Sequence, residues 1–385
     1  MIAGPRVLAA ALLAAAGACT ARDTVATSGA ADDDLPGYCA GTGPPVLVDG
    51  TCSGELAEEL FRRAVCGCGS LSFGSDLVTD GFDSRIAPYA SGGLGGDVAS
   101  NQGVDGSQGM DIGGELNVGP EGIEAGPILH VAGDLISGGQ LGRSSSEIEV
   151  EGAARVAGDV SVASLSVGGT LITRPGAAVS GEITAGAEES AEVSVPPPCR
   201  CDDALDVAGV IADHALVNHD AELGLEPDAL RDVDGDATLE LPCGRFYLDE
   251  IGGSTDGTVL VRATGRTALF VGGNISLQQN LDVEIGPDAE LDLFVAGSIQ
   301  VSGRAALGDP DRPRALRIYV ASGGSVSVSA GLALAGNLYA PLADLASSAE
   351  LEVFGALVVN HVNGAATVLV HHDRAVDDAG DSCVD

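Results

Sequence analysis

Short apolar runs alternate with polar residues along most of this 385-residue chain, and glycine-rich turns separate the runs. The run LFVGGNISLQ begins at Leu269, and the similar run LFVAGSIQVS begins at Leu293, 24 positions later. Alternation over about five residues predicts β-strands, and the Gly, Asn, Asp and Pro between the runs predict turns. Three such strands and three short turns fill about 24 residues, which is one turn of a parallel β-solenoid.

The repeat occurs in both halves of the chain. Gly133 and Gly158 align the segments LHVAGDLIS and ARVAGDVSV at a spacing of 25. Phe270, Phe294 and Tyr319 hold equivalent places at spacings of 24 and 25. Because stacked coils rise by roughly 4.8 Å each, we expect these three side chains to stack in one column. An antiparallel β-sandwich also uses short strands and glycine turns, but it does not require equivalent residues to recur every 24 or 25 positions.

Two segments have helical spacing instead. SGELAEELFRRAVCGC begins at Ser53, and DDALDVAGVIADHALVNHD begins at Asp202. In the second segment, Leu205, Ala208, Ile211 (or Ala212) and Ala215 share one face, and Asp202 or Asp203 is the expected cap. We expect this helix to pack across the flank of the solenoid or to bridge two parts of it.

These patterns divide the chain into seven predicted segments, and the solenoid occupies two of them. In chain order they are a signal peptide (1–18), a flexible tether (19–36), a Cys-rich N-terminal module or cap (37–69), the first part of the solenoid (70–198), a helical, Cys-containing insertion (199–245), the second part of the solenoid (246–372) and a C-terminal tail (373–385).

The N-terminus has the features of a bacterial targeting signal. Arg6 precedes an apolar run that is too short to span a bilayer. The small residues AGA then lead into Cys19 and resemble a lipobox, in which the cysteine is lipidated, although Ala stands where Leu is usual. Lipidation would anchor the chain to a membrane, and Thr20 favours the outer membrane, on its periplasmic or exposed side. The alternative is an ordinary signal peptide that is cleaved nearby.

The chain has nine cysteines, an odd number. If Cys19 carries a lipid, the other eight suffice for four disulfides in an oxidising compartment, and their pairing stays open. One staple is expected to join Cys199 or Cys201 to Cys243. A gap of one residue in each CxC pair is too short for a structural zinc site. The disulfide candidates are Cys39, Cys52, Cys66, Cys68, Cys199, Cys201, Cys243 and Cys383.

The formal charge of −38 combines 18 basic residues, all of them Arg, with 56 acidic ones. Such a surface repels nucleic acid and suits solubility or cation binding. Asp232, Asp234 and Asp236 alternate in DVDGDATLE, a spacing that can supply oxygen ligands to Ca²⁺. Ala237 stands where a calcium-binding EF-hand loop needs Gly, so calcium is a possible cofactor without a complete motif, and no other cofactor is expected.

Catalytic motifs are not apparent in the sequence. His371, His372 and Asp373 could bind metal with His361, but neighbouring residues of a strand point to opposite faces, so we expect structural roles for them. The chain has no Trp and no Lys, and it lacks the nucleophile-elbow, P-loop and HExxH patterns. We therefore expect a protein that is not an enzyme.

The segments LPCGRFYLDEI, ALFVGGNI, AELDLFVAGSI, NLYAPLADL, VFGALVVN and VLVHHDRAV occur in that order between Cys199 and Cys383. This order resembles a family of mostly uncharacterised, predicted bacterial envelope lipoproteins. The resemblance implies a C-terminal right-handed β-helix and an envelope location, and it transfers no catalytic residue. LYAP and the closing H-x-D are its most specific elements, and His372 stands where the family usually has Tyr.

We therefore expect an all-β protein, a right-handed parallel β-helix with a small disulfide-rich N-terminal region and a helical insertion. Its expected function is that of a non-catalytic structural, adhesive or assembly component of the bacterial cell envelope. Self-association or contact with envelope polysaccharide would use the sides or an uncapped end of the solenoid. The alternatives are a carbohydrate-active enzyme on the same scaffold and a calcium-dependent surface binding module.

Overall fold

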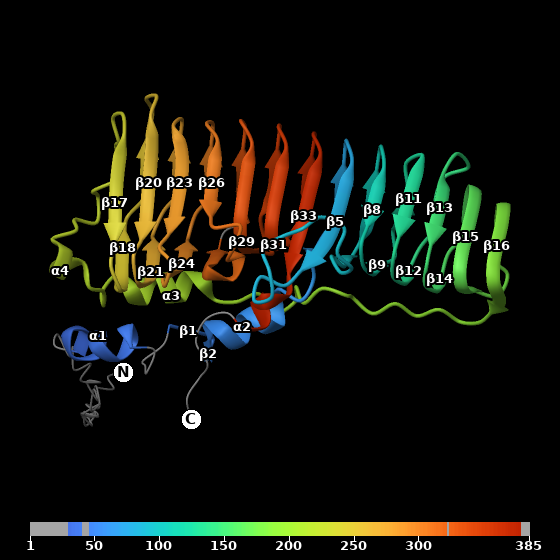
Figure 1. The fold of residues 1–385 in the computed structure, drawn as a ribbon, viewed down its shortest axis with the longest axis horizontal. Helices are drawn as coiled ribbons and strands as arrows, with labels where there is room; N and C mark the ends of the chain where they lie inside the picture. Colours follow the sequence, from blue (N-terminus) through green and yellow to red (C-terminus); the bar gives the residue numbers. More distant parts are fainter. Residues whose placement is uncertain (1–29, 41–45, 322, 379–385) are drawn as a thin grey trace, which may run out of the picture.

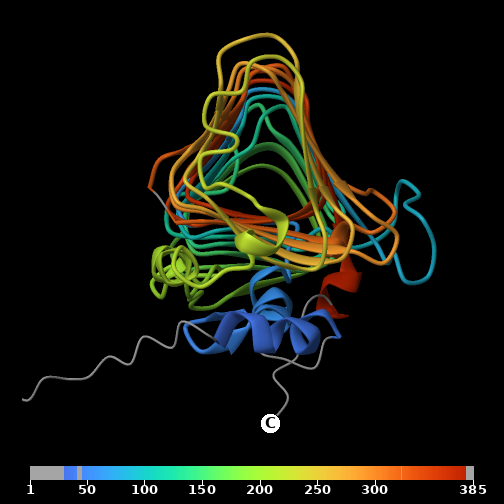
Figure 2. The same cartoon turned by 90° about the vertical axis from the view of Figure 1, so that its left-hand side faces the viewer.

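The computed structural model describes residues 30–40, 46–321 and 323–378, and most of them belong to parallel β-strands. Successive strands follow the three sides of a triangular tube, and each pairs with the equivalent strand of the next coil (Figures 1 and 2). Phe270 pairs with Phe294, and Phe294 pairs with Tyr319, in parallel register. The prediction of long parallel sheets is therefore confirmed.

One side of the tube lies against the helices, and we call it the covered face (Figure 2). Along the tube, its strands are β18 (Gly244–Leu248), β21 (Arg266–Val271), β24 (Glu290–Val295), β27 (Leu316–Val320), the second halves of β29 (Leu332–Ala340) and β31 (Leu351–Val359), β3 (Val65–Gly67), β6 (Val98–Ser100), β9 (Leu116–Val118), β12 (Leu135–Ser137) and β14 (Ala154–Val156).

The second side is a nine-stranded sheet whose outward side chains are mostly polar, and we call it the open face. Its strands are β19 (Ile251–Gly253), β22 (Ile275–Leu277), β25 (Ile299–Val301), β28 (Ser325–Val328), β30 (Asp344–Ser347), β32 (Val362–Gly364), β4 (Leu71–Phe73), β7 (Gly103–Gly106) and β10 (Gly122–Glu124).

The third face completes each coil. Two long strands, β15 (Val160–Thr173) and β16 (Val179–Ser190), bend around all three faces at one end of the tube. The other strands are β17 (Ala237–Leu241), β20 (Thr258–Ala263), β23 (Asn280–Ile285), β26 (Ala305–Gly308), the first halves of β29 and β31, β33 (Val368–Asp373), β5 (Leu77–Phe82), β8 (Met110–Ile112), β11 (Ile128–Val131) and β13 (Glu147–Val150).

The order of the coils in space differs from their order in the chain. β31, β32 and β33, the last strands, pair in parallel with β3, β4 and β5, among the first (Figure 1). Residues 65–190, the N-terminal half, therefore continue the tube where residues 237–373, the C-terminal half, end. The two halves meet at a central joint, and the strap, residues 191–206, runs back beneath the tube (Figure 1).

The apolar interior is built from columns of aliphatic residues. Val271, Val295 and Val320 are buried in register inside the tube. The neighbouring Phe270 and Phe294 point outward and are still fully buried, because helix α3 (Val207–His214) covers them. Ring centroids are 5.0 Å apart for Phe270 and Phe294 and 4.9 Å apart for Phe294 and Tyr319. The predicted aromatic column is confirmed, and its rings pack between the helix and the sheet.

Helix α3 confirms the helical interpretation of the insertion, but its predicted cap and face are wrong: Val207, Val210 and Ile211 are buried, and Ala208 is exposed. Asp206, not Asp202 or Asp203, is the N-cap, and its side chain accepts a hydrogen bond from the Gly209 amide. The preceding strap is extended and is held to the covered face by the disulfides of Cys199 and Cys201. The remaining small elements are α1 (Ala30–Cys39), β1 (Leu47–Val48), β2 (Thr51–Cys52), α2 (Ser53–Leu60), α4 (Asp220–Leu223), and the 3₁₀ turns η1 (Pro313–Ala315) and η2 (Arg374–Asp378).

Disulfides tie α1 and the strap to the covered face. The pairs are Cys39–Cys243, Cys66–Cys199 and Cys68–Cys201, and Cys52 is also disulfide-bonded. The expected staple between Cys243 and Cys199 or Cys201 is therefore wrong. Cys243 lies near the first coil, whereas Cys199 and Cys201 lie where the strap passes the central joint. The predicted partners are therefore far apart along the tube. Cys19 and Cys383, with the predicted signal peptide, lie outside the described residues.

The two ends of the tube are finished differently. At one end, α4 crosses the opening (Figure 2), and Leu230 is buried with the first coil. At the other end, β16 pairs with β15, and no other strand among the described residues pairs with it. Glu188 of β16 is in register with the buried Leu171, so it occupies an inward-facing position. An inward charge on an edge strand works against stacking by another strand.

Candidate functional site

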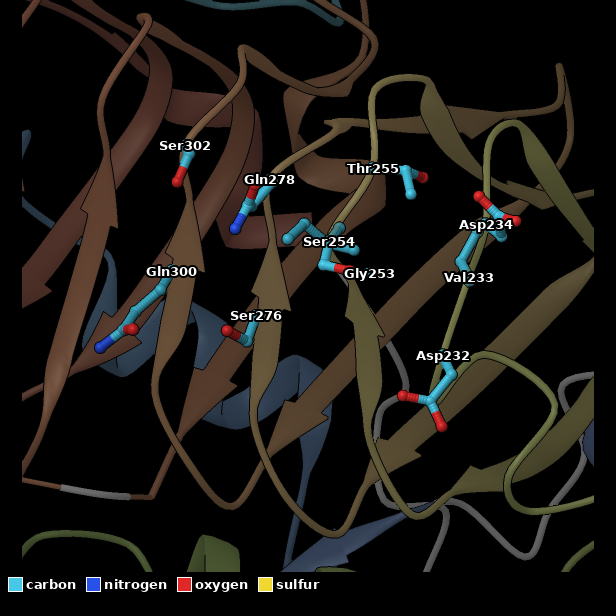
Figure 3. A pocket seen from close by; sticks show the side chains of 11 residues that line it. Asp232, Val233, Asp234, Gly253, Ser254, Thr255, Ser276, Gln278, Gln300 and Ser302 are labelled. Carbon is cyan, nitrogen blue, oxygen red and sulfur yellow. The ribbon is translucent and has the colours of Figure 1, made fainter.

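A polar groove of about 610 Å³ lies on the open face, near the end closed by α4. Ser276 and Gln300 are the middle residues of β22 and β25 and are paired in register. Their neighbours Ile275 and Leu277 are buried, so strand alternation turns the polar residue of each triplet outward. Figure 3 shows the two side chains on adjacent strands. The same columnar stacking that buries the core thus builds a polar surface.

Most side chains of the groove are uncharged hydroxyls and amides. Ser254, Thr255, Gln278 and Ser302 come from the turns beside β19, β22 and β25. The carboxylates of Asp232 and Asp234 form one wall (Figure 3). Hydroxyl and amide groups both donate and accept hydrogen bonds, and carboxylates only accept. This arrangement suits a ligand rich in hydroxyl groups and disfavours an anionic one.

A buried glutamine fixes the acidic wall. Gln279 is 1% exposed, and its Nε2 donates to the carbonyl oxygens of Val233 at 3.1 Å and Gly235 at 3.4 Å. The Val233 amide in turn donates to the Gly252 carbonyl oxygen. The wall is therefore held by backbone contacts, which leaves the side chains of its two aspartates at the surface.

The three candidate calcium ligands do not converge. Asp232 and Asp234 line the groove, whereas Asp236 Oδ1 accepts a hydrogen bond from the Thr258 amide of the next coil at 2.9 Å. Across the part of the chain that the structure describes, no three His, Cys, Asp or Glu side chains are placed to hold a metal ion. The described residues also contain no helix long and apolar enough to cross a bilayer.

The four candidate residues of the C-terminal motif lie at the central joint, where each contacts a residue between Phe61 and Ser84. The contacts are His361 Nδ1 to the Ser70 carbonyl oxygen (3.0 Å), His371 Nδ1 to Asp80 Oδ1 (2.7 Å), His372 Nε2 to the Phe61 carbonyl oxygen (2.9 Å), and Asp373 Oδ2 to Ser84 Oγ (2.7 Å). Gly69 allows the His361 ring to pack closely, because a Cβ there would overlap the ring.

Burial and hydrogen bonding shift the pKa of two of these groups. Burial lowers the pKa of His372, because the charged imidazolium would lose its hydration. Burial alone would raise the pKa of Asp80, but hydrogen bonds from His371, the Gly92 amide and Tyr89 lower it overall. The four residues of the C-terminal motif therefore have a structural role, in which they hold the two ends of the chain together at the central joint.

Residues 206–379 match a domain of unknown function, DUF7305. The DUF7305 segment starts at the cap of α3 and includes every strand of the C-terminal half, so it stops at the central joint. No curated protein and no solved structure matches the chain. In this chain, the open coil edge at the end of the DUF7305 segment is occupied by β3, β4 and β5.

Sequence reasoning missed the groove, although a signal was present. The triplets ISL and IQV, centred on Ser276 and Gln300, each place one polar residue between two apolar ones. Their spacing of 24 equals that of Phe270 and Phe294, so the repeat that predicted the aromatic column also predicts a polar column. The acidic wall could not be found in this way, because it lies outside the repeat.

Proposed function

We propose that this protein is a non-catalytic structural and adhesive component of the bacterial cell envelope, anchored through an acyl group on Cys19. We further propose that its stacked parallel strands form a right-handed β-helix, because parallel strands are joined by right-handed crossovers in almost all known cases. The matched domain carries no assigned activity, so the proposal depends on surface chemistry.

The observation that carries the adhesive role is the polar groove. Ser276, Gln278, Gln300 and Ser302 are exposed in register on neighbouring coils, and their spacing repeats by one strand separation, roughly 4.8 Å. A linear polysaccharide presents hydroxyl groups at regular intervals and could contact several coils at once. We propose uncharged envelope or host polysaccharide as the ligand class, since the chain's charge of −38 opposes acidic polymers.

Binding of the mature protein to a glycan array, followed by titration of the best ligand, tests this role. Ser276→Ala with Gln300→Ala should weaken binding about tenfold, since each lost hydrogen bond contributes about 0.5–1.5 kcal/mol. Ser72→Ala with Asn363→Ala is the matched control, because these residues occupy the same outward column at the central joint. Absence of any glycan ligand, or equal losses in both variants, would refute the role.

A carbohydrate-active enzyme is the second candidate, because Asp232 and Asp234 place two carboxylates in the groove. Glycoside hydrolysis uses such a pair as acid and base or nucleophile. A reducing-sugar assay on glycans that bind the array separates the classes. Turnover that disappears in Asp232→Asn or Asp234→Asn would replace the adhesive proposal with the enzymatic one.

Calcium-dependent binding, the third candidate function, is tested at the acidic wall formed by Asp232 and Asp234. A calcium site would make the melting temperature fall on addition of a chelator, and Asp234→Ala would abolish that effect. The geometry of Asp236, which is engaged by the next coil, favours no effect of the chelator.

The proposed anchor has its own test. Mass spectrometry of the mature N-terminus should find an acylated Cys19, and an unmodified N-terminus elsewhere would favour the ordinary signal peptide. Cell fractionation would then assign the protein to the outer membrane and to its periplasmic or exposed side.

A further inference from the structure

We infer that a small basic cavity on the covered face binds a phosphate group. The cavity has a volume of about 130 Å³ and lies between α2, the strap and strands β3 and β31. Arg62, Arg63 and Arg200 line it, and Glu59 is its only acidic lining residue within the described chain. Pockets for drug-sized molecules begin at about 300 Å³, so this one fits a single anionic group.

The three arginines converge from two separate segments. Arg63 Nη1 donates to the Pro198 carbonyl oxygen at 2.9 Å, and Arg62 Nε donates to the Glu58 carbonyl oxygen at 3.2 Å. Arg200, from the strap, forms an ion pair with Glu59. A guanidinium has five N–H donors in a planar fork, so these contacts leave donors that can turn toward a phosphate in the cavity.

The surroundings favour an anion at this place. Two of the guanidinium charges are not balanced by a lining carboxylate, in a chain with 56 acidic and only 18 basic residues. Leu60, Val358 and the disulfide-bonded Cys66 contribute apolar lining. Stabilisation of the C-terminal end of α2 accounts for Arg62, which binds a carbonyl oxygen of that helix, but not for Arg200 of the strap.

The position of the cavity points to a lipid headgroup as one source of the phosphate, an assignment that rests on the proposed anchor. The first described helix, α1, lies beside the covered face (Figure 1). The chain between Cys19 and Ala30 can span at most roughly 40 Å when fully extended. An acyl group on Cys19 would therefore keep the covered face, and this cavity with it, close to the membrane surface.

Phosphate binding is tested on the mature chain by titration with inorganic phosphate, followed by calorimetry or ³¹P NMR line broadening. Binding of the Cys19→Ser variant, which cannot carry the proposed acyl anchor, to vesicles of phosphatidylcholine, with and without phosphatidylglycerol, tests the lipid source. Arg62→Gln with Arg63→Gln and Arg200→Gln should weaken both interactions at least about tenfold, and added salt should weaken them in the wild type. Arg62→Lys with Arg200→Lys, which keeps the charge but loses the fork, should have an intermediate effect.

The matched control replaces three arginines of surface ion pairs elsewhere, Arg143, Arg262 and Arg304, with Gln. Melting curves show whether each variant is folded, and the mild variant Arg62→Gln serves if the triple variant is not. Equal loss in control and cavity variants, or no loss in either, overturns the site. Phosphate binding without vesicle binding assigns the site to a soluble phosphate, and an unacylated Cys19 disproves the anchor while leaving the phosphate result intact.

Discussion

His371 Nδ1 and Asp80 Oδ1 are 2.7 Å apart, although 291 positions separate the two residues in the chain. They belong to β33 and β5, the paired strands at which the C-terminal half meets the N-terminal half. Tyr89 Oη and the Gly92 amide also donate to Asp80 Oδ2, at 2.8 and 3.0 Å. The central joint is therefore held by a polar network in addition to parallel pairing.

Asp80→Asn should destabilise the fold by about 2 kcal/mol at neutral pH, the usual loss for hydrogen bonds to a charged group. Because the pKa of Asp80 is lowered in the folded state, its contribution is present above the unfolded value, about 3.9, and disappears as the pH falls through the folded value. Urea unfolding across this range should show the difference from wild type shrinking with acid. Asp256→Asn, at an exposed position, should change little.

His372→Gln should flatten the loss of stability between about pH 6.5 and 5. The lowered pKa of buried His372 means that the unfolded chain takes up the proton first, so stability falls below the unfolded pKa at up to about 1.4 kcal/mol per pH unit. His214, whose pKa burial also lowers, remains in the variant and keeps part of the slope. Urea unfolding at several pH values measures this.

His130 provides a control of opposite sign. Hydrogen bonds to Asp111, with a smaller contribution from Glu151, raise the pKa of His130. Its contribution is therefore full below the unfolded pKa and disappears as the pH rises through the folded value. His130→Gln should remove stability in acid rather than restore it. The same response in both variants would contradict the assigned roles.

Phe294→Ala should cost about 3–5 kcal/mol, as expected for a buried aromatic residue. Its ring is 0% exposed and lies between Phe270 and Tyr319 in the aromatic column. Ile136 belongs to the same outward column farther along the covered face, where it is only half-buried. Ile136→Ala should cost far less, and thermal unfolding compares the two. Equal costs would show that the helices contribute nothing to the column.

Neutralising the open end of the tube should cause self-association. Glu182, Glu188 and Glu189 place three carboxylates on β16, whose outer edge is unpaired within the described part of the chain. In the combined variant Glu182→Thr, Glu188→Val and Glu189→Thr, the sedimentation coefficient should increase as the protein concentration increases. The reason is that the carboxylates no longer repel the edge strand of a second molecule. The same charge change at Glu147, Glu149 and Glu240 is the control. Identical sedimentation of both variants would show that the carboxylates of β16 do not prevent self-association.

Local sequence predicted the repeat but not the order of the coils. Phe270, Phe294 and Tyr319 were placed in one column from spacing alone, because a parallel coil keeps equivalent residues in register. The pairing of β33 with β5 could not be predicted from the repeat, because neither strand's sequence indicates which neighbouring strand it pairs with. For the same reason, the sequence does not reveal the partner of Cys243, because disulfide pairing depends on the path of the strap along the tube.

The sequence marks Asp232 and Asp234 as candidate site residues through their alternating spacing, but it does not place them in a groove with Ser276 and Gln300. Ser276 and Gln300 recur at the coil spacing, whereas Asp232 and Asp234 reach the groove through the irregular cap segment. The closing His371, His372 and Asp373 show the limit most clearly. The sequence predicts structural roles for them, but their partners Asp80, Phe61 and Ser84 lie 289 to 311 positions away, so the contacts themselves required the three-dimensional arrangement.

The central joint also dictates an order of events during synthesis. Residues 65–82 leave the ribosome early, yet the strands they must join, residues 351–373, emerge nearly last. The Cys66–Cys199 and Cys68–Cys201 bridges can close as soon as residue 201 has been made and reaches an oxidising environment. Oxidation can therefore pin the first-made half into a loop while one of its edges still waits for the end of the chain.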